Sequence, residues 1–268
     1  SIFMFFKEVD RMTDSYKELQ DKCRTLRLAE TARELPALLR KAESKGWTYY
    51  EFINQVLGYE LACREEKNRT KLMKWAEFPQ LLSLEEFKLE EQSAIGDKQL
   101  NVLKELSWIE ENFTLIMMGP PGAGKTHLST GLGIHAVNQG YQVSFVSMDR
   151  LIYILKSREY ISKSRTRYKR ITTSDLIIID DVMYMAYEPQ DAQLFFQFVY
   201  EMYDNAAFIL TSNKGPAEWG KFLGDTTLTT AILDRLLHRS EIITFDEDSD
   251  SIRMKYRRAL FKETGVES

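Results

Sequence analysis

The sequence predicts an α/β fold, in which a parallel β-sheet is flanked by helices and is preceded by a smaller all-helical region. From Phe113 onward, apolar runs of strand length alternate with helical stretches, a pattern typical of parallel sheets. Before about residue 100, leucines recur at the three- and four-residue spacings of amphipathic helices. A glycine-rich loop follows the first strand-like run. We therefore expect a helical domain over residues 1–97 and an α/β domain over residues 98–268.

In the front half, the apolar spacing predicts helices over Ser15–Arg33, Pro36–Lys45 and Tyr49–Lys74. The segment from Pro79 to Gly96 lacks a clear period and is expected to be an irregular connector. In the second half, five strands are expected, at Thr114–Met118, Gln142–Ser147, Leu176–Asp180, Ala207–Thr211 and Glu241–Phe245.

Composition narrows the class of protein. The 268 residues are 44% hydrophobic and 28% charged, with a net charge of −4, which suits a soluble globular protein and argues against a wholly basic nucleic-acid coat protein. The apolar runs are too short to span a bilayer, and Ile2–Phe6 does not resemble a secretion signal. Cys23 and Cys63 have no metal-ligand spacing. We expect a cytoplasmic protein without a membrane partner.

The strongest motif is Gly119-Pro120-Pro121-Gly122-Ala123-Gly124-Lys125-Thr126, which satisfies G-x-x-x-x-G-K-[ST] between a predicted strand and a predicted helix. The glycines let successive backbone N–H groups turn toward one anion at a helix N-terminus. Lys125 is expected to contact the β- and γ-phosphates of ATP, and the Thr126 hydroxyl to coordinate Mg²⁺. Residues 119–126 and the adjoining His127 form the predicted nucleotide-binding set.

Two strand ends carry polar groups. Leu176-Ile177-Ile178-Ile179 runs into Asp180 and Asp181, and an apolar strand ends at Thr211-Ser212-Asn213. Parallel strands present their carboxyl ends at the ligand crevice. Asp180 is therefore expected to hold the Mg²⁺ shell, Asp181 to polarise the attacking water, and Asn213 to contact the γ-phosphate or that water.

These motifs, together with Ala231–Leu236, Ser251-Ile252-Arg253, Leu35–Leu38 and Glu60–Arg69, resemble the DnaC/IstB branch of AAA+ ATPases over about Leu26 to Phe261. The front half resembles IstB, the ATPase helper of insertion-sequence transposases. The resemblance implies an AAA+ core with strand order 5-1-4-3-2 and Asn213 as a sensor. It also implies Arg235 as a finger acting on a neighbouring subunit's ATP, and Arg253 as a second sensor. From the residues alone, Arg235 could equally pair with Asp234 or Glu241, and Arg253 could pair with the acids of residues 246–248.

The chain departs from the family in one respect and matches the DnaC/IstB branch in another. Asp181 stands where the family often has Glu, so Glu188 is a second candidate for the catalytic base. Only 23 residues follow Phe245, which predicts that the helical lid domain of many AAA+ proteins is absent, as it is in the DnaC/IstB branch.

A cationic run with interleaved tyrosines lies between the second and third predicted strands and is suited to phosphate contacts. The predicted nucleic-acid residues in it are Lys163, Arg165, Arg167, Lys169 and Arg170. The alternative interpretation of this run is a solvated helix face that binds no nucleic acid. For a second basic stretch, Arg64 to Lys74, the sequence does not separate DNA binding from the polar face of a bundle helix.

The hypothesis favoured by the sequence is a Mg²⁺-dependent ATPase that assembles as a homo-oligomer on duplex DNA and presents it to a partner transposase. One alternative is a helicase loader of the DnaC or DnaI kind, disfavoured by the absence of a cysteine cluster. The other is an ATP-dependent DNA scaffold with little hydrolysis, which the Asp180-Asp181 pair leaves open.

Overall fold

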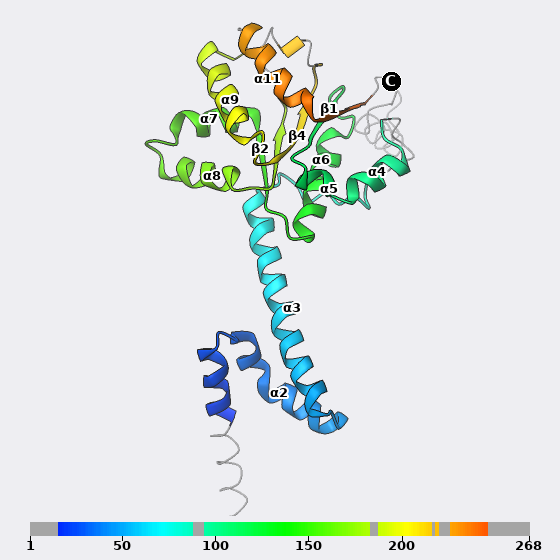
Figure 1. The fold of residues 1–268 in the computed structure, drawn as a ribbon, viewed down its shortest axis with the longest axis vertical. Coiled ribbons are helices and arrows are strands. Elements are labelled where there is room, and N and C mark those ends of the chain that lie inside the picture. The colour runs from blue at the N-terminus through cyan, green and yellow to red at the C-terminus, as the bar shows by residue number, and fades with distance from the viewer. Residues whose placement is uncertain (1–15, 88–93, 183–186, 216–217, 220–225, 246–268) are drawn as a thin grey trace, which may run out of the picture. The chain divides into compact units, whose positions relative to one another are not determined.

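The computed structural model describes residues 16–87, 94–182, 187–215, 218–219 and 226–245. Packing divides the chain into two compact units, Ser1–Thr70 and Lys71–Ser268 (Figure 1). The boundary lies earlier than the expected boundary near residue 97. The physical reason is that Leu72, Ala76, Leu84, Phe87 and Ile95 are buried in a core of the second unit.

The first unit is helical, as expected, with a helix over residues 16–25, α2 at Ala29–Lys45 and most of α3, Tyr49–Ala76. The expected break before Pro36 is wrong, because α2 continues through Pro36 and the chain turns instead at residues 26–28. Proline has no N–H for the carbonyl four residues earlier. The Gln20 side-chain amide donates to that carbonyl, the Ala32 oxygen, at 2.8 Å, which offsets the lost helical bond.

The second unit contains a five-stranded sheet in the order β2-β3-β4-β1-β5, with every pairing parallel. Read from the other edge, this is the expected order 5-1-4-3-2, and the α/β prediction is confirmed. The strands are β1 Thr114–Met118, β2 Val143–Ser147, β3 Leu176–Asp180, β4 Ala207–Ser212 and β5 Ser240–Thr244. Each differs from its expected bounds by one residue at most.

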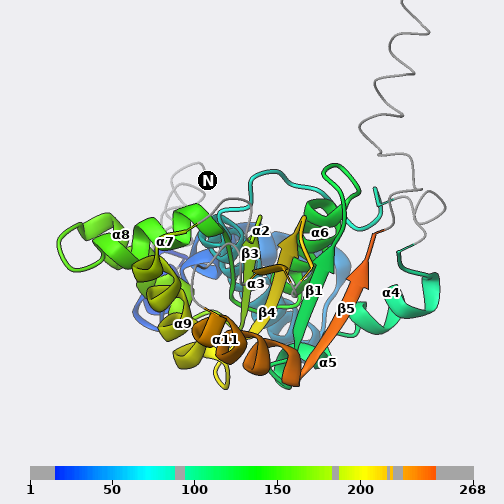
Figure 2. The same cartoon turned by 90° about the horizontal axis from the view of Figure 1, so that it is seen from above.

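Helices cover both faces of this sheet (Figure 2). Their bounds are α4 Asp97–Lys104, α5 Ser107–Glu110, α6 Lys125–Asn138, α7 Met148–Ser157, α8 Ser162–Thr172, α9 Pro189–Met202 and α11 Thr226–His238. Side chains alternate along each strand, so Ile178 joins the core shared with α4, α5 and α6, while Ile177 and Ile179 join the core shared with α7, α9 and α11.

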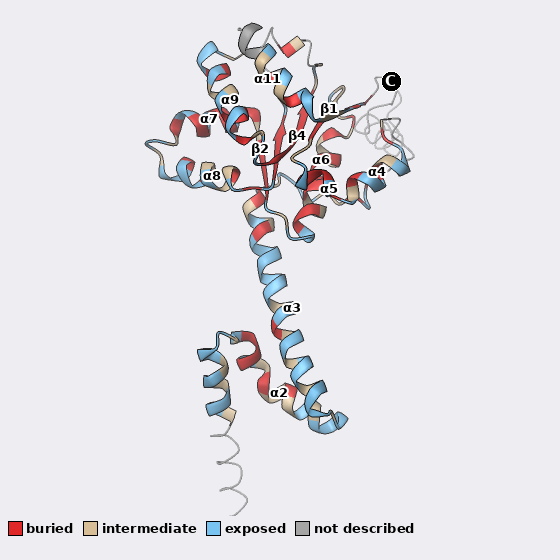
Figure 3. Ribbon diagram, in the orientation of Figure 1, coloured by how far each residue is buried: buried red, intermediate tan, exposed pale blue. Residues whose placement is uncertain are grey.

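The central strands are therefore buried on both faces, as Figure 3 shows in red. This burial explains their continuous apolar runs, which are typical of parallel sheets. Among the described residues, no helix has the length and apolar character needed to cross a membrane.

Candidate functional site: a nucleotide pocket and a cationic helix

The phosphate loop begins at the carboxyl end of β1, the strand that lies between β4 and β5 in the sheet. The register aligns Met118 of β1 with Ser212 of β4, and Ile179 of β3 with Leu210 of β4. The polar groups that follow β1, β3 and β4 therefore lie at one edge of the sheet. This is the edge at which parallel α/β sheets bind ligands.

The loop glycines have backbone angles that other residues rarely adopt. Gly122 and Gly124 have φ values of 82° and 104°, and Gly124 is the residue from which α6 begins. Because Gly124 has no side chain to cap the first turn, the first N–H groups of α6 suit a phosphate. Gly119, with φ 148°, is required by close packing against Phe245. A Cβ at this position would overlap the Phe245 carbonyl oxygen and lie 2.7 Å from Phe245 Cβ.

Lys125 is buried, and its ammonium group is held by oxygen acceptors from two segments. Nζ donates to the Gly119 and Pro120 carbonyls at 2.7 and 2.8 Å, and to Asn213 Oδ1 at 2.9 Å. The structure thus brings together the loop lysine and the candidate sensor, Asn213, which directly follows β4. An ammonium group so placed can exchange these acceptors for phosphate oxygens.

A hydroxyl–carboxylate cluster lies beside the lysine. Thr126 Oγ1 donates to both Asp180 carboxylate oxygens, at 3.1 and 3.3 Å, and the Thr211 hydroxyl donates to Asp180 Oδ1. Burial raises the pKa of the Asp180 carboxyl, and Asp181 adds to this, while the two hydroxyls and Lys125 oppose it. The Thr126 hydroxyl and the Asp180 carboxylate are hard oxygen donors, which fits Mg²⁺, an ion that takes few protein ligands beside phosphate oxygens and water.

Asp181 and Glu188, the two candidate bases, differ in position. Asp181 is exposed, lines the nucleotide pocket and has φ 56°, a left-handed conformation that Asp tolerates better than most residues. Its backbone N–H donates to Thr211 Oγ1 at 3.0 Å, which fixes the turn after β3. Glu188 precedes α9 and does not appear among the described residues that line the pocket. The geometry favours Asp181.

The pocket has a volume of about 690 Å³. Its wall contains residues that sequence reasoning missed, namely Pro79, Gln80 and Leu82 from the connector between α3 and α4. Nearby contacts hold this segment, since His127 Nε2 lies 3.0 Å from the Ser83 carbonyl oxygen and its ring packs edge-on against Phe87. These residues show no apolar periodicity in the sequence. The only signal was the absence of a helical pattern in this segment, which predicts an irregular connector but does not place it at the pocket.

The residues of the phosphate loop differ in whether they face the pocket or the core. Pro121, Gly122, Gly124, Thr126 and His127 line the pocket, whereas Ala123 is buried in the hydrophobic core. Ala123 therefore shapes the loop from inside the core.

The cationic run forms α8, and four of the five predicted nucleic-acid residues there are at least partly accessible. Lys163, Arg165 and Lys169 are exposed and Arg170 is half-buried. Arg165 also donates to the Arg158 and Glu159 carbonyl oxygens, at 3.3 and 2.7 Å, so part of its role is to close the end of α7. The side-chain ammonium groups of Lys163 and Lys169 have no ion-pair or hydrogen-bond partner among the described residues.

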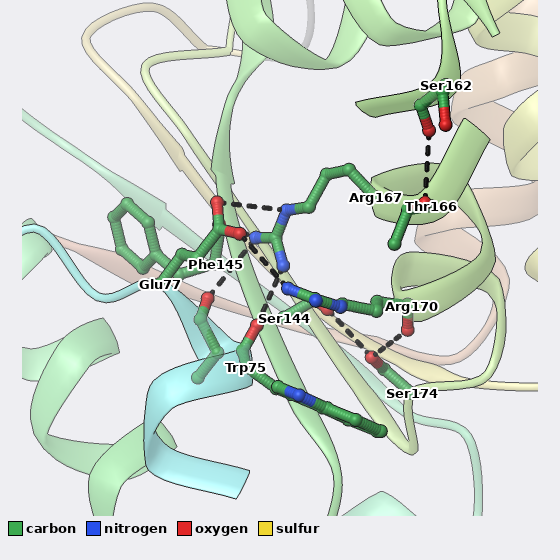
Figure 4. A network of polar contacts seen from close by, with 10 residues as sticks. Trp75, Glu77, Ser144, Phe145, Ser162, Thr166, Arg167, Arg170 and Ser174 are labelled. Carbon is green, nitrogen blue, oxygen red and sulfur yellow. Dashed lines mark hydrogen bonds and ion pairs between the residues drawn. The ribbon is translucent and has the colours of Figure 1, made fainter. Parts of the chain in front are cut away.

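Arg167 has to be removed from the predicted nucleic-acid set. It is only 6% exposed, and its guanidinium donates to the Trp75 and Phe145 carbonyls at 2.8 and 2.6 Å (Figure 4). Burial lowers the pKa of Arg167, and the Glu77 carboxylate, 3.2 Å from Nε, opposes this. Helical periodicity explains the exception, because residues 164, 167 and 171 lie on the face of α8 that packs inward.

The second basic stretch, left undecided by the sequence, falls into two parts. In the first unit, Arg64 pairs with Glu60 at 3.0 Å, Lys67 with Glu30, and Arg69 with Glu66 at 2.7 Å. These three cations are the neutralised polar side of a bundle helix. Lys71 and Lys74, which belong to the second unit, are exposed and have no carboxylate partner among the described residues.

Arg235, the candidate finger, lies on α11 and is half-buried. Its guanidinium carbon lies 4.1 Å from the ring centroid of Tyr200, in α9, and 5.7 Å from that of Tyr203, which directly follows α9. Neither Asp234 nor Glu241 pairs with it among the described contacts. Arg235 does not line the pocket of its own chain, as a residue acting on a neighbour's nucleotide requires. Arg253 lies outside the described residues.

Comparison with known proteins gives a coherent result over most of the chain. The family described as "IstB-like ATP binding protein" matches residues 21–259. The insertion sequence IS21 putative ATP-binding protein of Pseudomonas aeruginosa is 35% identical over 241 residues, 90% of each chain. The insertion sequence IS5376 putative ATP-binding protein of Geobacillus stearothermophilus is 30% identical over 242 residues, 90% of this chain and 96% of that one.

Solved structures support the fold. AMPPCP-bound DnaA from Aquifex aeolicus matches with a TM-score of 0.51 at 22% identity, covering 72% of this chain and 58% of that chain. A DnaI structure matches with a TM-score of 0.51 at 17% identity, covering 61% and 90%. The fold is that of an AAA+ P-loop core, and by the family match the chain belongs to the IstB-like ATP-binding proteins of insertion sequences.

Proposed function

We propose that this protein is a Mg²⁺-dependent ATPase that assembles on duplex DNA and presents that DNA to a partner transposase. The observation that carries the ATPase assignment is the convergence of Lys125, Thr126, Asp180 and Asn213 around one pocket. The names of the relatives describe them as ATP-binding proteins of insertion sequences, which is consistent with a role in transposition.

Each residue of the pocket has a separate task in this proposal. Lys125 gives up the Gly119 and Pro120 carbonyls to contact the β- and γ-phosphates of ATP. Thr126 and Asp180 hold Mg²⁺, which when bound neutralises charge on the phosphate oxygens. Asp181 accepts a proton from the attacking water, and Asn213 fixes the position of that water or of the γ-phosphate.

The DNA surface in this proposal is the exposed side of α8. Lys163 and Lys169 support it most directly, because no described carboxylate neutralises either of them. A lysine without an internal partner can release counterions from a DNA phosphate, which stabilises the complex at low salt. Self-assembly follows from Arg235, which supplies a guanidinium to the ATP of a neighbouring subunit.

The test measures ATP turnover and duplex-DNA affinity for the native chain, for the double variant Lys163→Glu/Lys169→Glu and for Lys98→Glu. Lys98 is an exposed lysine of α4 and serves as a control for a single Lys→Glu reversal made away from α8. We expect the double variant to lose at least roughly tenfold in DNA affinity at moderate salt, since two phosphate contacts become repulsive. ATP affinity in the absence of DNA should be unchanged in both variants.

Two outcomes would contradict the proposal. Equal DNA affinity in the double variant and the Lys98 control would remove α8 from the DNA surface. ATP binding without turnover, with and without duplex DNA, would replace the ATPase by a nucleotide-dependent scaffold.

A further inference from the structure

A buried arginine joins the last turn of α3 to α8. Arg167 of α8 donates to the Trp75 carbonyl at 2.8 Å (Figure 4). It also donates to the Ala76 carbonyl, at 3.3 Å. Carbonyls in the last turn of a helix have no partner within the helix, so Arg167 caps α3 from outside. Because its guanidinium also donates to Phe145 of β2, at 2.6 Å, α3 and α8 are fixed to the same edge of the sheet.

The residue after α3 completes this joint. Glu77 has φ 58°, the left-handed conformation that ends many helices and that usually favours glycine. Its carboxylate forms an ion pair with Arg167 at 3.2 Å and a second one with Arg170 at 3.6 Å. The two arginines thus stabilise a backbone conformation that is unfavourable for Glu by itself.

An aromatic ring lies next to this joint and contacts a cation from each helix. The Trp75 ring centroid is 4.3 Å from Lys71 Nζ of α3 and 5.3 Å from the Arg170 guanidinium carbon of α8. Both contacts are in the range of cation–π attraction. Lys74 is one residue before Trp75, and the helical period of 100° per residue places it on the exposed side of α3, with Lys71 and away from buried Leu72 and Ala76.

The charges in this cluster do not balance. Lys71, Arg167 and Arg170 carry three positive charges, and Glu77 is the carboxylate that the described ion pairs provide for them. Bringing cations together costs free energy unless an anion compensates them. The accessible cations are Lys71 and Arg170 of this cluster, together with the neighbouring Lys74, because Arg167 is buried.

We propose that the ends of α3 and α8 form one surface for the phosphate backbone of duplex DNA, with Lys71, Lys74 and Arg170 as its contacts and Arg167 as the residue that fixes their spacing. This inference rests on the proposed DNA binding and extends it beyond α8 to α3. The Trp75 ring is already occupied by two cations and is half-buried, so it orients them and does not stack on an unpaired base. Two rows of cations held at a fixed separation suit a duplex better than a flexible single strand.

The first experiment measures duplex-DNA affinity of the full chain as a function of salt for Lys71→Gln/Lys74→Gln and for Arg69→Gln. Arg69 is the matched control, since it lies on the same helix but pairs with Glu66 at 2.7 Å. The slope of log affinity against log salt should fall by about 0.9 for each lost phosphate contact, hence by about 1.8 for the double variant. The Arg69 variant should keep the native slope.

A variant that is expected to raise DNA affinity, and not to lower it, gives an independent test. Glu77 is half-exposed, and Glu77→Gln removes the carboxylate of the cluster without removing a cation. We expect DNA affinity to rise severalfold at low salt, and the rise to disappear at high salt, where charges are screened. A carboxylate with a purely structural role would instead leave DNA affinity unchanged or lower it.

The results separate this inference from the function on which it rests. A native salt slope in Lys71→Gln/Lys74→Gln, combined with a loss in Lys163→Glu/Lys169→Glu, would overturn the α3 surface and leave DNA binding by α8 intact. Native affinity in both double variants would overturn the DNA-binding proposal itself. A loss confined to single-stranded DNA would also overturn the inference, because the surface is assigned to duplex.

Discussion

Buried charged groups show at the scale of single residues how much of this fold depends on partners distant in sequence. Glu60 of α3 is 4% exposed, and its carboxylate accepts the Thr31 N–H at 2.8 Å and the Arg64 Nε at 3.0 Å. Burial alone raises the pKa of Glu60, but the bonds from Thr31 and Arg64 outweigh burial, and the net pKa lies below the usual 4.5. Glu60 therefore joins α2 to α3 in its ionised form.

The variant Glu60→Gln tests this joint. A carboxyl whose folded pKa is depressed contributes stability above its unfolded pKa and loses it as pH falls through the folded value. We expect the variant to lose about 1.5–3 kcal/mol at pH 7, typical of a hydrogen bond to a charged group, and to approach the native protein as the pH falls from 4.5 through the lower folded pKa. Hydrogen exchange of the Thr31 amide, measured at both pH values, reports the effect locally. A pH-independent difference would refute the role of the charge.

At the scale of elements, the connector after α3 shows how a segment without periodicity is positioned. It packs on α6 at two glycines: a Cβ on Gly131 would lie 2.7 Å from Leu84 Cδ2, and one on Gly133 would lie 2.7 Å from Ile178 Cδ1 and 2.8 Å from Phe78 Cε1. The same connector supplies Pro79, Gln80 and Leu82 to the pocket wall. The glycines of α6 therefore serve the pocket through packing.

Gly133→Ala tests this packing. Because the Phe78 ring has to move to admit the methyl group, we expect a loss of about 1–3 kcal/mol in unfolding free energy and weaker ATP affinity. Gly58→Ala is the matched control, since Gly58 lies inside α3 with nothing within 4 Å of the added Cβ, and alanine there should stabilise by about 0.5–1 kcal/mol. Urea denaturation and nucleotide titration measure both. Unchanged ATP affinity in Gly133→Ala would show that the connector does not shape the pocket.

At the scale of the whole molecule, we propose that the ATPase site is divided between two chains. Lys125 lines the pocket, whereas Arg235 is held against Tyr200 on α9 and does not line it. An arginine kept charged and extended over an aromatic ring is available to a second molecule. In this proposal, one chain carries both halves of the site, but on different surfaces.

Mixing two inactive variants tests this division. Lys125→Ala and Arg235→Ala should each reduce turnover by about 10³-fold or more, as expected for loss of an arginine finger or a phosphate-binding lysine. Their mixture should regain part of the activity, since interfaces between the intact pocket of one variant and the intact arginine of the other are complete. The measurement is steady-state phosphate release against mixing ratio. If the mixture stays as inactive as its parents, Arg235 acts within its own chain or not at all.

The sequence determined the features that depend on local pattern. The strand-length apolar runs, the glycine-rich loop and the acidic end of β3 predicted the sheet and the elements around the phosphate site, because the carboxyl ends of parallel strands meet at one edge. Local pattern failed at Pro36, where a helix continues because Gln20 takes up the freed carbonyl. No window of sequence contains both residues of that contact.

Only the tertiary structure decided which cations are free. Arg167 and Lys169 are two residues apart in one basic run, yet Arg167 is buried against the carbonyls of α3 and β2 while Lys169 is exposed. Likewise, Lys67 is paired with Glu30, whereas Lys71, four residues later, lies over Trp75. The sequence determined how many charges each helix carries. Which of these charges a ligand can reach depends on burial and on partners from other elements, and these exist only once the chain has folded.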